Sequence, residues 1–148
     1  MELSVSKMEL ADLDVVLALE NIAFVSPWSR SSFLYELLEN PRAVYLAAKF
    51  DGQLAGYIGM WEIFDEGHIT NLAVHPDFRR QGIARRLLWD LTEIAKSHGI
   101  LKLTLEVRQS NLPAQLLYAK IGFVKAGVRR RYYRDNNEDA LIMWKSPI

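Results

Sequence analysis

HITNLAVHPDFRRQGIARRLLW, residues 68–89, is the stretch that decides the fold. An apolar run at 69–74 is followed by His75-Pro76-Asp77, and a helical pattern begins just after Gly82. The stretch therefore predicts a buried strand that leads through one tight turn into a helix. The first N–H groups of a helix have no partner within the helix, and the aligned peptide dipoles favour an anion at that end. We expect a phosphate group to bind at this turn.

Basic residues gather around the same turn: Arg79, Arg80, Arg85 and Arg86. Gly82 and the small Ala84 allow a ligand to approach the main chain closely, so the arginines favour an anion site. A solvated helix start that binds nothing explains the same residues, because a short glycine loop before a helix is a weak signal. The loops G-x-G-x-x-G and G-x-x-x-x-G-K-S/T are absent, which disfavours a dinucleotide or ATP site.

A family resemblance becomes specific at this turn. R-R-Q-G-I-A at 79–84 resembles the acyl-CoA pyrophosphate loop, (Q/R)-x-x-G-x-(G/A), of the GNAT superfamily of acetyltransferases, and L-A-V-H-P-D-F at 72–78 resembles its cofactor-binding strand. Further matching segments are P-W-S at 27–29, L-E-V-R at 105–108, S-N-L-P-A-Q-L-L-Y at 110–118, G-F at 122–123 and R-R-R-Y-Y at 129–133. In this order, over nearly the whole chain, they resemble the RimI-type ribosomal-protein-alanine N-acetyltransferases. Ala84 stands where many relatives carry glycine, which the motif tolerates.

Composition limits the classes of protein that fit. The chain has 148 residues, half of them hydrophobic, which predicts one domain over residues 1–148. Basic and acidic residues number 18 each, so no overall field favours nucleic acid or an anionic membrane. Cysteine is absent, which excludes disulfides, thiolate-bound metals and a cysteine acyl-enzyme. We find neither a signal peptide nor an apolar run that approaches the ~20 residues of a membrane span, and expect a cytoplasmic protein.

Hydrophobic periodicity predicts the remaining elements. Strands are expected at 3–8, 43–50, 53–64, 67–74, 101–108, 123–131 and 139–144, and helices at 11–24, 30–38, 83–97 and 111–121. Expected signals are caps at Asp12 and Ser29, a hairpin turn at Asp51-Gly52 and a helix stop at Gly99. Antiparallel hairpins around a central strand–helix–strand unit predict an α/β fold. The expected architecture is a GNAT-like mixed, mostly antiparallel sheet of about seven strands, with about four helices on its faces.

Two residues are candidates for catalysis. Glu106 lies on the polar face of the strand at 101–108, where pairing with Lys102, Arg108 or solvent is the alternative to a functional role. The resemblance implies that Glu106 is the general base, since an amine attacks a thioester only as the neutral species. Tyr118 has the helical spacing of a core aromatic, whereas the resemblance implies a general acid for the departing thiolate.

The resemblance also implies where acetyl-CoA binds. The implied cofactor residues are Leu72, Ala73, Val74, Arg79, Arg80, Gln81, Gly82, Ile83, Ala84, Arg85 and Asn111. Residues 72–74 would align the pantetheine by strand-like hydrogen bonds, and the N–H of Val74 would meet the developing oxyanion. Helix capping is the alternative role for Asn111.

The acceptor side and the function follow from the same resemblance. Trp28, Tyr132 and Tyr133 are expected to form a narrow slot for an extended N-terminus, although Trp28 also suits a core-closing loop aromatic and 129–133 a solvated strand end. The three histidines lack ligand spacing, so no metal is expected. We expect acetyl transfer from acetyl-CoA to the N-terminal α-amine of a ribosomal protein, with alanine as the first residue, by direct attack in a ternary complex. The alternatives are a small-molecule amine acetyltransferase and a catalytically silent acetyl-CoA-binding module.

Overall fold

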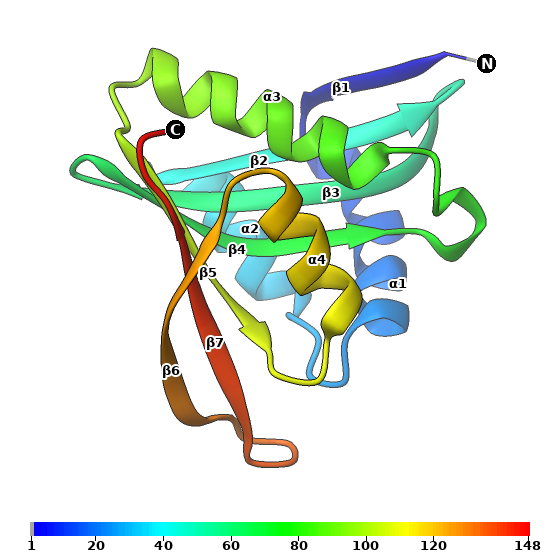
Figure 1. Ribbon diagram of the computed structural model, residues 1–148. Helices are drawn as coiled ribbons and strands as arrows, with labels where there is room; N and C mark the ends of the chain where they lie inside the picture. Colours follow the sequence, from blue (N-terminus) through cyan, green and yellow to red (C-terminus); the bar gives the residue numbers. More distant parts are fainter. Residues whose placement is uncertain (1) are drawn as a thin grey trace.

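A seven-stranded sheet forms the centre of the protein, whose computed structural model describes residues 2–148. Its strands are β1 (Leu3–Lys7), β2 (Ala43–Phe50), β3 (Gln53–Ile63), β4 (Glu66–Val74), β5 (Lys102–Arg108), β6 (Val124–Tyr133) and β7 (Glu138–Lys145). The helices are α1 (Leu13–Ala23), α2 (Arg30–Leu38), α3 (Ile83–Ser97) and α4 (Leu112–Lys120), with short 3-10 turns η1 (Leu10–Asp12) and η2 (Pro76–Phe78). The strand order is β1-β2-β3-β4-β5-β7-β6, and the β4–β5 pair is parallel while the other pairs are antiparallel. The expected mixed, mostly antiparallel architecture is confirmed (Figure 1).

Local signals in the sequence set most of the element ends. Asp51 and Gly52 both have positive φ, 49° and 84°, as a tight two-residue hairpin requires. Ser29 caps α2 by accepting a hydrogen bond from the N–H of Ser32, at 3.2 Å. Gly99 follows the last turn of α3 in the left-handed region, with φ 82°. These three predictions are confirmed.

The predicted cap at Asp12 is wrong. Its carboxylate does not cap α1, which begins at the next residue. Instead it accepts a hydrogen bond from the N–H of Glu9 at 2.8 Å and pairs with the Lys49 ammonium at 2.8 Å. Asp12 is the third residue of the 3-10 turn η1, so its carboxylate forms a capping box with Glu9 at the start of that turn, and Lys49 of β2 neutralises its charge.

β6 runs further than the predicted 123–131 because its pairing with β7 is irregular. Between the pairs Arg129↔Ala140 and Tyr133↔Glu138 the register shifts. Within this irregularity Arg131 takes a φ of 53°, and its N–H donates to the Asp139 carboxylate at 2.9 Å. The side-chain acceptor replaces a ladder bond, so pairing resumes at Tyr133.

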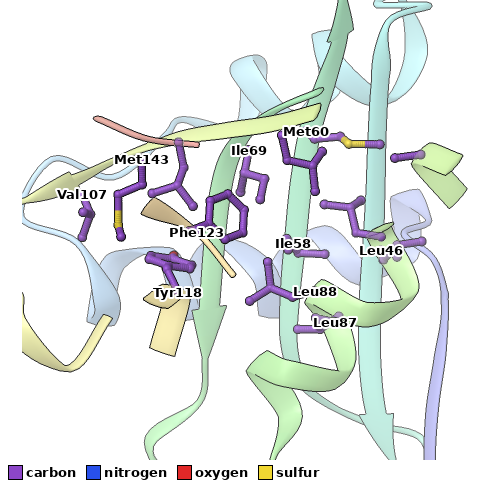
Figure 2. Close-up of a cluster of buried hydrophobic side chains, with 14 of the residues drawn as sticks. Leu46, Ile58, Met60, Ile69, Leu87, Leu88, Val107, Tyr118, Phe123 and Met143 are labelled. Atoms are coloured by element: carbon purple, nitrogen blue, oxygen red, sulfur yellow. The ribbon is translucent and has the colours of Figure 1, made fainter. Parts of the chain in front are cut away.

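Two hydrophobic clusters cover the two faces of the sheet. α3 and α4 pack on one face, where Leu87, Leu88, Tyr118 and Phe123 meet the sheet in the cluster drawn in Figure 2. α1 and α2 pack on the other face, through residues that include Val16, Leu19, Phe33, Tyr45 and Tyr57. Figure 1 shows the helix pairs on opposite sides of the sheet.

A bulge in β4 changes which side chains face which cluster. Gly59 pairs with Asn71 and Met60 with Ile69, so Thr70 is an extra residue in β4. Regular alternation would place Ile69 and Ala73 on the same face. Because of the extra residue, Ile69 packs in the cluster under α3 while Ala73 packs in the cluster under α1. The bulge lies at the middle of the strand expected to bind acetyl-CoA.

Candidate functional site

β4 and β5 pair over only three residues and then separate. Their parallel register runs from Glu66↔Lys102 to His68↔Thr104. Beyond that point β4 stays bonded to β3, and β5 to β7. Backbone N–H and C=O groups alternate between the two edges of a strand, so about half of those after His68 in β4 face an edge with no strand on it. An extended chain that carries amides, such as pantetheine, fits this edge by the same hydrogen bonding as a strand.

The turn between β4 and α3 presents main-chain N–H groups that have no hydrogen-bond acceptor among the described residues. Gly82 immediately precedes α3 with φ 75°, and no side chain caps the helix. The first backbone hydrogen bond at this end runs from the Arg86 N–H to the Gly82 carbonyl at 3.0 Å. The N–H groups of the three residues between them have no acceptor among residues 2–148, and they suit a phosphate.

The arginines of this turn divide into two kinds. Arg86 pairs with Asp90, one helical turn away, at 3.1 Å. Arg79, Arg80 and Arg85 are exposed and have no carboxylate at ion-pair distance in the part of the chain that the structure describes. These three cations therefore lie available around the helix start.

Some of the proposed cofactor residues contribute main chain rather than side chain. Ile83 is 1% exposed and packs into the cluster under α3, and Ala73 is buried in the cluster under α1. Leu72 and Val74 are half-buried, whereas Gln81 is exposed. Asn111 caps α4 by accepting a hydrogen bond from the Ala114 N–H at 3.2 Å, so the capping alternative is confirmed.

Gly82→Asp is expected to weaken acetyl-CoA binding by about tenfold or more. A Cβ at Gly82 meets no atom within 4 Å, so the new carboxylate would project into the space in front of the helix N-terminus. There it would occupy the anion site and repel a pyrophosphate. Calorimetric titration with acetyl-CoA measures the effect.

Gly99→Asp is the matched control for that variant. Gly99 also has positive φ and no atom within 4 Å of its Cβ position, but it lies beyond the other end of α3. The backbone strain and the added charge are therefore similar, while the first turn of α3 is untouched. Equal acetyl-CoA affinity in the two variants would refute the anion site at Gly82.

Glu106 is held by two basic side chains where β4 and β5 separate. Its Oε2 lies 2.5 Å from His68 Nε2, and Arg129 Nε donates to its Oε1 at 3.2 Å. Burial acts to raise the pKa of Glu106, but the hydrogen bonds and charges of His68 and Arg129 outweigh it and lower the pKa. The carboxylate is therefore ionised throughout the neutral range and available as an acceptor.

The partners of Glu106 differ from those that the sequence suggested. Lys102 pairs with Glu66 at 3.5 Å, and Arg108 pairs with Asp135 and Glu138, so neither contacts Glu106. The contact between His68 and Glu106 is not predicted from the sequence, because the histidines are considered there only as metal ligands. A signal existed: parallel pairing of the strands that flank α3 brings the start of β4 beside β5, but the register that aligns His68 is not readable from the sequence.

Tyr118 lies in the hydrophobic cluster under α3 and α4, with Val107 of β5, the residue next to Glu106. It is 8% exposed and packs edge-on against Phe123 with ring centroids 5.7 Å apart, beside Val107 and Met143 (Figure 2). Its hydroxyl makes no hydrogen bond with residues 2–148, and none joins it to Glu106. Burial, with a smaller effect of Tyr133, raises the pKa of Tyr118, so the phenol keeps its proton at neutral pH.

Two of the three aromatic residues of the expected slot, Tyr132 and Tyr133, pack edge-on with ring centroids 5.1 Å apart, and no aromatic pair among residues 2–148 joins either of them to Trp28. Trp28 packs against Phe33 and Tyr45, with centroids 5.4 and 6.5 Å away, so it does close the core. Tyr133 lies under the Arg108 guanidinium at 4.0 Å. Tyr132 is 46% exposed, and burial together with the Glu106 carboxylate raises its pKa. The slot stays a prediction.

Among residues 2–148 no three His, Asp or Glu side chains are grouped as metal ligands. No helix in this range is long and apolar enough to cross a bilayer.

Known proteins resemble this chain over almost its full length. A model of the acetyltransferase (GNAT) family matches residues 13–123. A protein of Bacillus subtilis (strain 168), provisionally assigned as a ribosomal protein bS18-alanine N-acetyltransferase, is 48% identical over 141 residues, 95% of this chain and 93% of its own. The ribosomal protein bS18-alanine N-acetyltransferase of Escherichia coli (strain K12) is 36% identical over 142 residues, 95% of each chain. The crystal structure of the ribosomal-protein-S18-alanine N-acetyltransferase from Escherichia coli has a TM-score of 0.90 at 34% identity, covering 99% of this chain and 94% of that one.

Proposed function

This chain belongs to the GNAT family of acetyltransferases, and from that membership we propose that it acetylates the N-terminal α-amine of a ribosomal protein, with alanine as the preferred first residue. The relatives that are named for this reaction match it over nearly their whole length. The observation that carries the proposal is the ionised Glu106, held by His68 and Arg129 beside the open edge of β4.

Acetyl-CoA supplies an acetyl group activated as a thioester. The N–H groups at the start of α3, with Arg79, Arg80 and Arg85, are the residues that fit its pyrophosphate. The open edge of β4 fits the pantetheine. We assign the N–H of Val74 to the carbonyl oxygen, where negative charge develops during attack.

Glu106 takes the proton of the attacking amine, directly or through one water. A carboxylate with a lowered pKa is a weak base toward a free ammonium, whose pKa is near 7.7–8.0. The amine must therefore lose its first proton to solvent. As nitrogen forms its bond to carbon, its two remaining protons become much more acidic; Glu106 takes one of them, for which a weak base suffices, and the other stays on the amide product.

A peptide α-amine is expected to be a far better acceptor than a lysine side chain. At pH 7 the neutral form costs about 1 kcal/mol for an α-amine and about 4.6 kcal/mol for a free lysine amine. We expect kcat/KM for an Ala-initiated peptide to exceed, by at least about 100-fold, that for the same peptide with a blocked α-amine and a free internal lysine. Release of CoA measures both.

The same assay separates the competing functions. A Trp-initiated peptide tests whether the first side chain must be small, and equal turnover with Ala would remove only the narrow slot formed by Trp28, Tyr132 and Tyr133. Equal turnover of the free and blocked peptides would contradict the N-terminal assignment. Turnover of small amines alone would identify a small-molecule enzyme, and acetyl-CoA binding without any turnover a silent binding module.

The proposed substrate also indicates the cellular compartment of the enzyme. Newly made ribosomal proteins are in the cytoplasm, so we propose a cytoplasmic enzyme. The balanced net charge of the chain supports recognition of the protein N-terminus rather than of nucleic acid.

A further inference from the structure

A pocket lies apart from the residues expected to bind acetyl-CoA. It has a volume of about 410 Å³ and lies between the α1–α2 connection, α2 and the end of β3. Its walls are Trp28, Ser31, Ser32, Tyr35, Glu36 and Trp61. Pockets that hold small ligands have volumes of about 300–1,000 Å³, so one long side chain fits this one.

Glu36 is the charged group of this pocket, and it has no cation. Glu36 is only 6% exposed. Oε2 accepts hydrogen bonds from Trp61 Nε1 at 2.9 Å and from Asn40 Nδ2 at 2.7 Å. Over residues 2–148 no donor reaches Oε1, and no Lys, Arg or His lies at ion-pair distance. No buried side-chain oxygen among the described residues lacks a partner, so Oε1 is open to solvent in the pocket, where a cation can reach it.

Glu20 shows how the fold treats a buried carboxyl that faces no pocket. One oxygen accepts from the Tyr57 hydroxyl, and the other accepts from the Trp28 N–H at 2.8 Å. Burial raises the pKa of Glu20, and both of its oxygens have partners. The free oxygen of Glu36 therefore distinguishes the pocket from an ordinary buried polar network.

Aromatic rings supply the rest of the walls. The faces of tryptophan and tyrosine attract a guanidinium or ammonium group, most strongly where water is excluded. Trp28 and Trp61 are held in place by packing and by the hydrogen bond to Glu36, so the walls are already formed. A carboxylate between two indoles and a phenol is suited to a cation on an apolar stem.

Building on the proposed function, we infer that this pocket holds an arginine or lysine side chain of the acceptor peptide, at its second or third residue. Trp61 links the pocket to the candidate base: its ring centroid is 6.0 Å from that of His68, and His68 Nε2 is 2.5 Å from Glu106. An extended peptide advances about 3.3–3.6 Å per residue. An α-amine at Glu106 therefore puts the second or third residue beside the pocket.

The test uses pairs of Ala-initiated peptides that carry arginine or its neutral isostere citrulline at residue two or three. Calorimetric Kd values in the presence of CoA measure binding, and kcat/KM with acetyl-CoA measures transfer. We expect the arginine peptide to bind about tenfold more tightly in one of the two pairs, with a lower KM and an unchanged kcat. Glu36→Gln, which keeps an acceptor for Trp61 and Asn40, is expected to remove this preference.

Glu39→Gln is the matched control, because it removes the same charge from the exposed end of α2 outside the pocket. It is expected to keep the preference. Acetylation of both peptides without any preference for arginine would overturn the cation pocket and leave the proposed function standing. Tighter binding of arginine without acetyl transfer would support the pocket and contradict the acceptor assignment. A preference that survives Glu36→Gln would overturn the pocket.

Discussion

Glu106→Gln is expected to lower kcat/KM for peptide acetylation by ~10²–10⁴-fold, the range for a lost general base. Glutamine keeps the shape of the side chain and an oxygen that can accept from Arg129, but it cannot take a proton. The fold and acetyl-CoA affinity should be retained, because Glu106 lies apart from the N-terminus of α3. CoA release gives the rate, and calorimetry gives the affinity.

The pH dependence of the wild type supports the same assignment. The lowered pKa of Glu106 keeps it ionised from well below neutral pH upward. Between pH 6 and 8, kcat/KM is therefore expected to rise with deprotonation of the amine, near 7.7–8.0, and not with a carboxyl group. Partial recovery of kcat/KM in the Glu106→Gln variant at higher pH would support the base role, because hydroxide can then accept the proton in place of the carboxylate.

Glu66→Gln is the control for Glu106→Gln. Glu66 is also a carboxylate at the β4–β5 pair, where it binds Lys102 at 3.5 Å, but it lies at the end where the strands still pair. Its loss should leave kcat/KM nearly unchanged. If Glu106→Gln behaves in the same way, the Glu106 carboxylate only holds His68 and Arg129 in place.

Tyr118→Phe is expected to lower kcat by ~10²–10⁴-fold, as for a lost general acid. Burial raises the pKa of Tyr118, so the phenol is protonated and can donate to the leaving sulfur. Full transfer to a thiolate, whose thiol has an ordinary pKa of ~8.5, requires the same apolar surroundings to raise the pKa of that thiol. Single-turnover measurements separate this step from product release.

Stability is the control for the tyrosine variant. Phenylalanine keeps the ring that packs on Phe123, and the lost hydroxyl has no hydrogen-bond partner in residues 2–148. The thermal midpoint should therefore be unchanged. A double variant, Glu106→Gln with Tyr118→Phe, that still transfers acetyl at the wild-type rate would make both residues structural.

Much of the architecture could be predicted because its signals are local. Asp51-Gly52 sets a hairpin through the positive φ of both residues, and Ser29 caps a helix through a partner three residues away. The predicted anion site before α3 depends only on neighbouring residues: a glycine, N–H groups without hydrogen-bond partners, and arginines close by in the sequence. The sequence by itself therefore determined most of the strands and helices, and it predicts where an anion binds.

Contacts between distant residues needed the tertiary structure. The extra residue Thr70 in β4 is defined only by pairing with β3, because a bulge exists only against a partner strand. Asp12 illustrates the same point, since its ion pair with Lys49 joins η1 to a strand far along the chain and has no local signal.

The candidate site divides in the same way. The family motif marks Glu106 and Tyr118, but the parallel register of β4 and β5 decides that His68 holds the carboxylate. The chain path that brings α2 over β3 likewise decides that Glu36 lies between Trp28 and Trp61. Residue types and spacing determine which groups are present, whereas strand register and helix packing determine which charges meet, because a side chain's partner is set by distance in space and not along the chain.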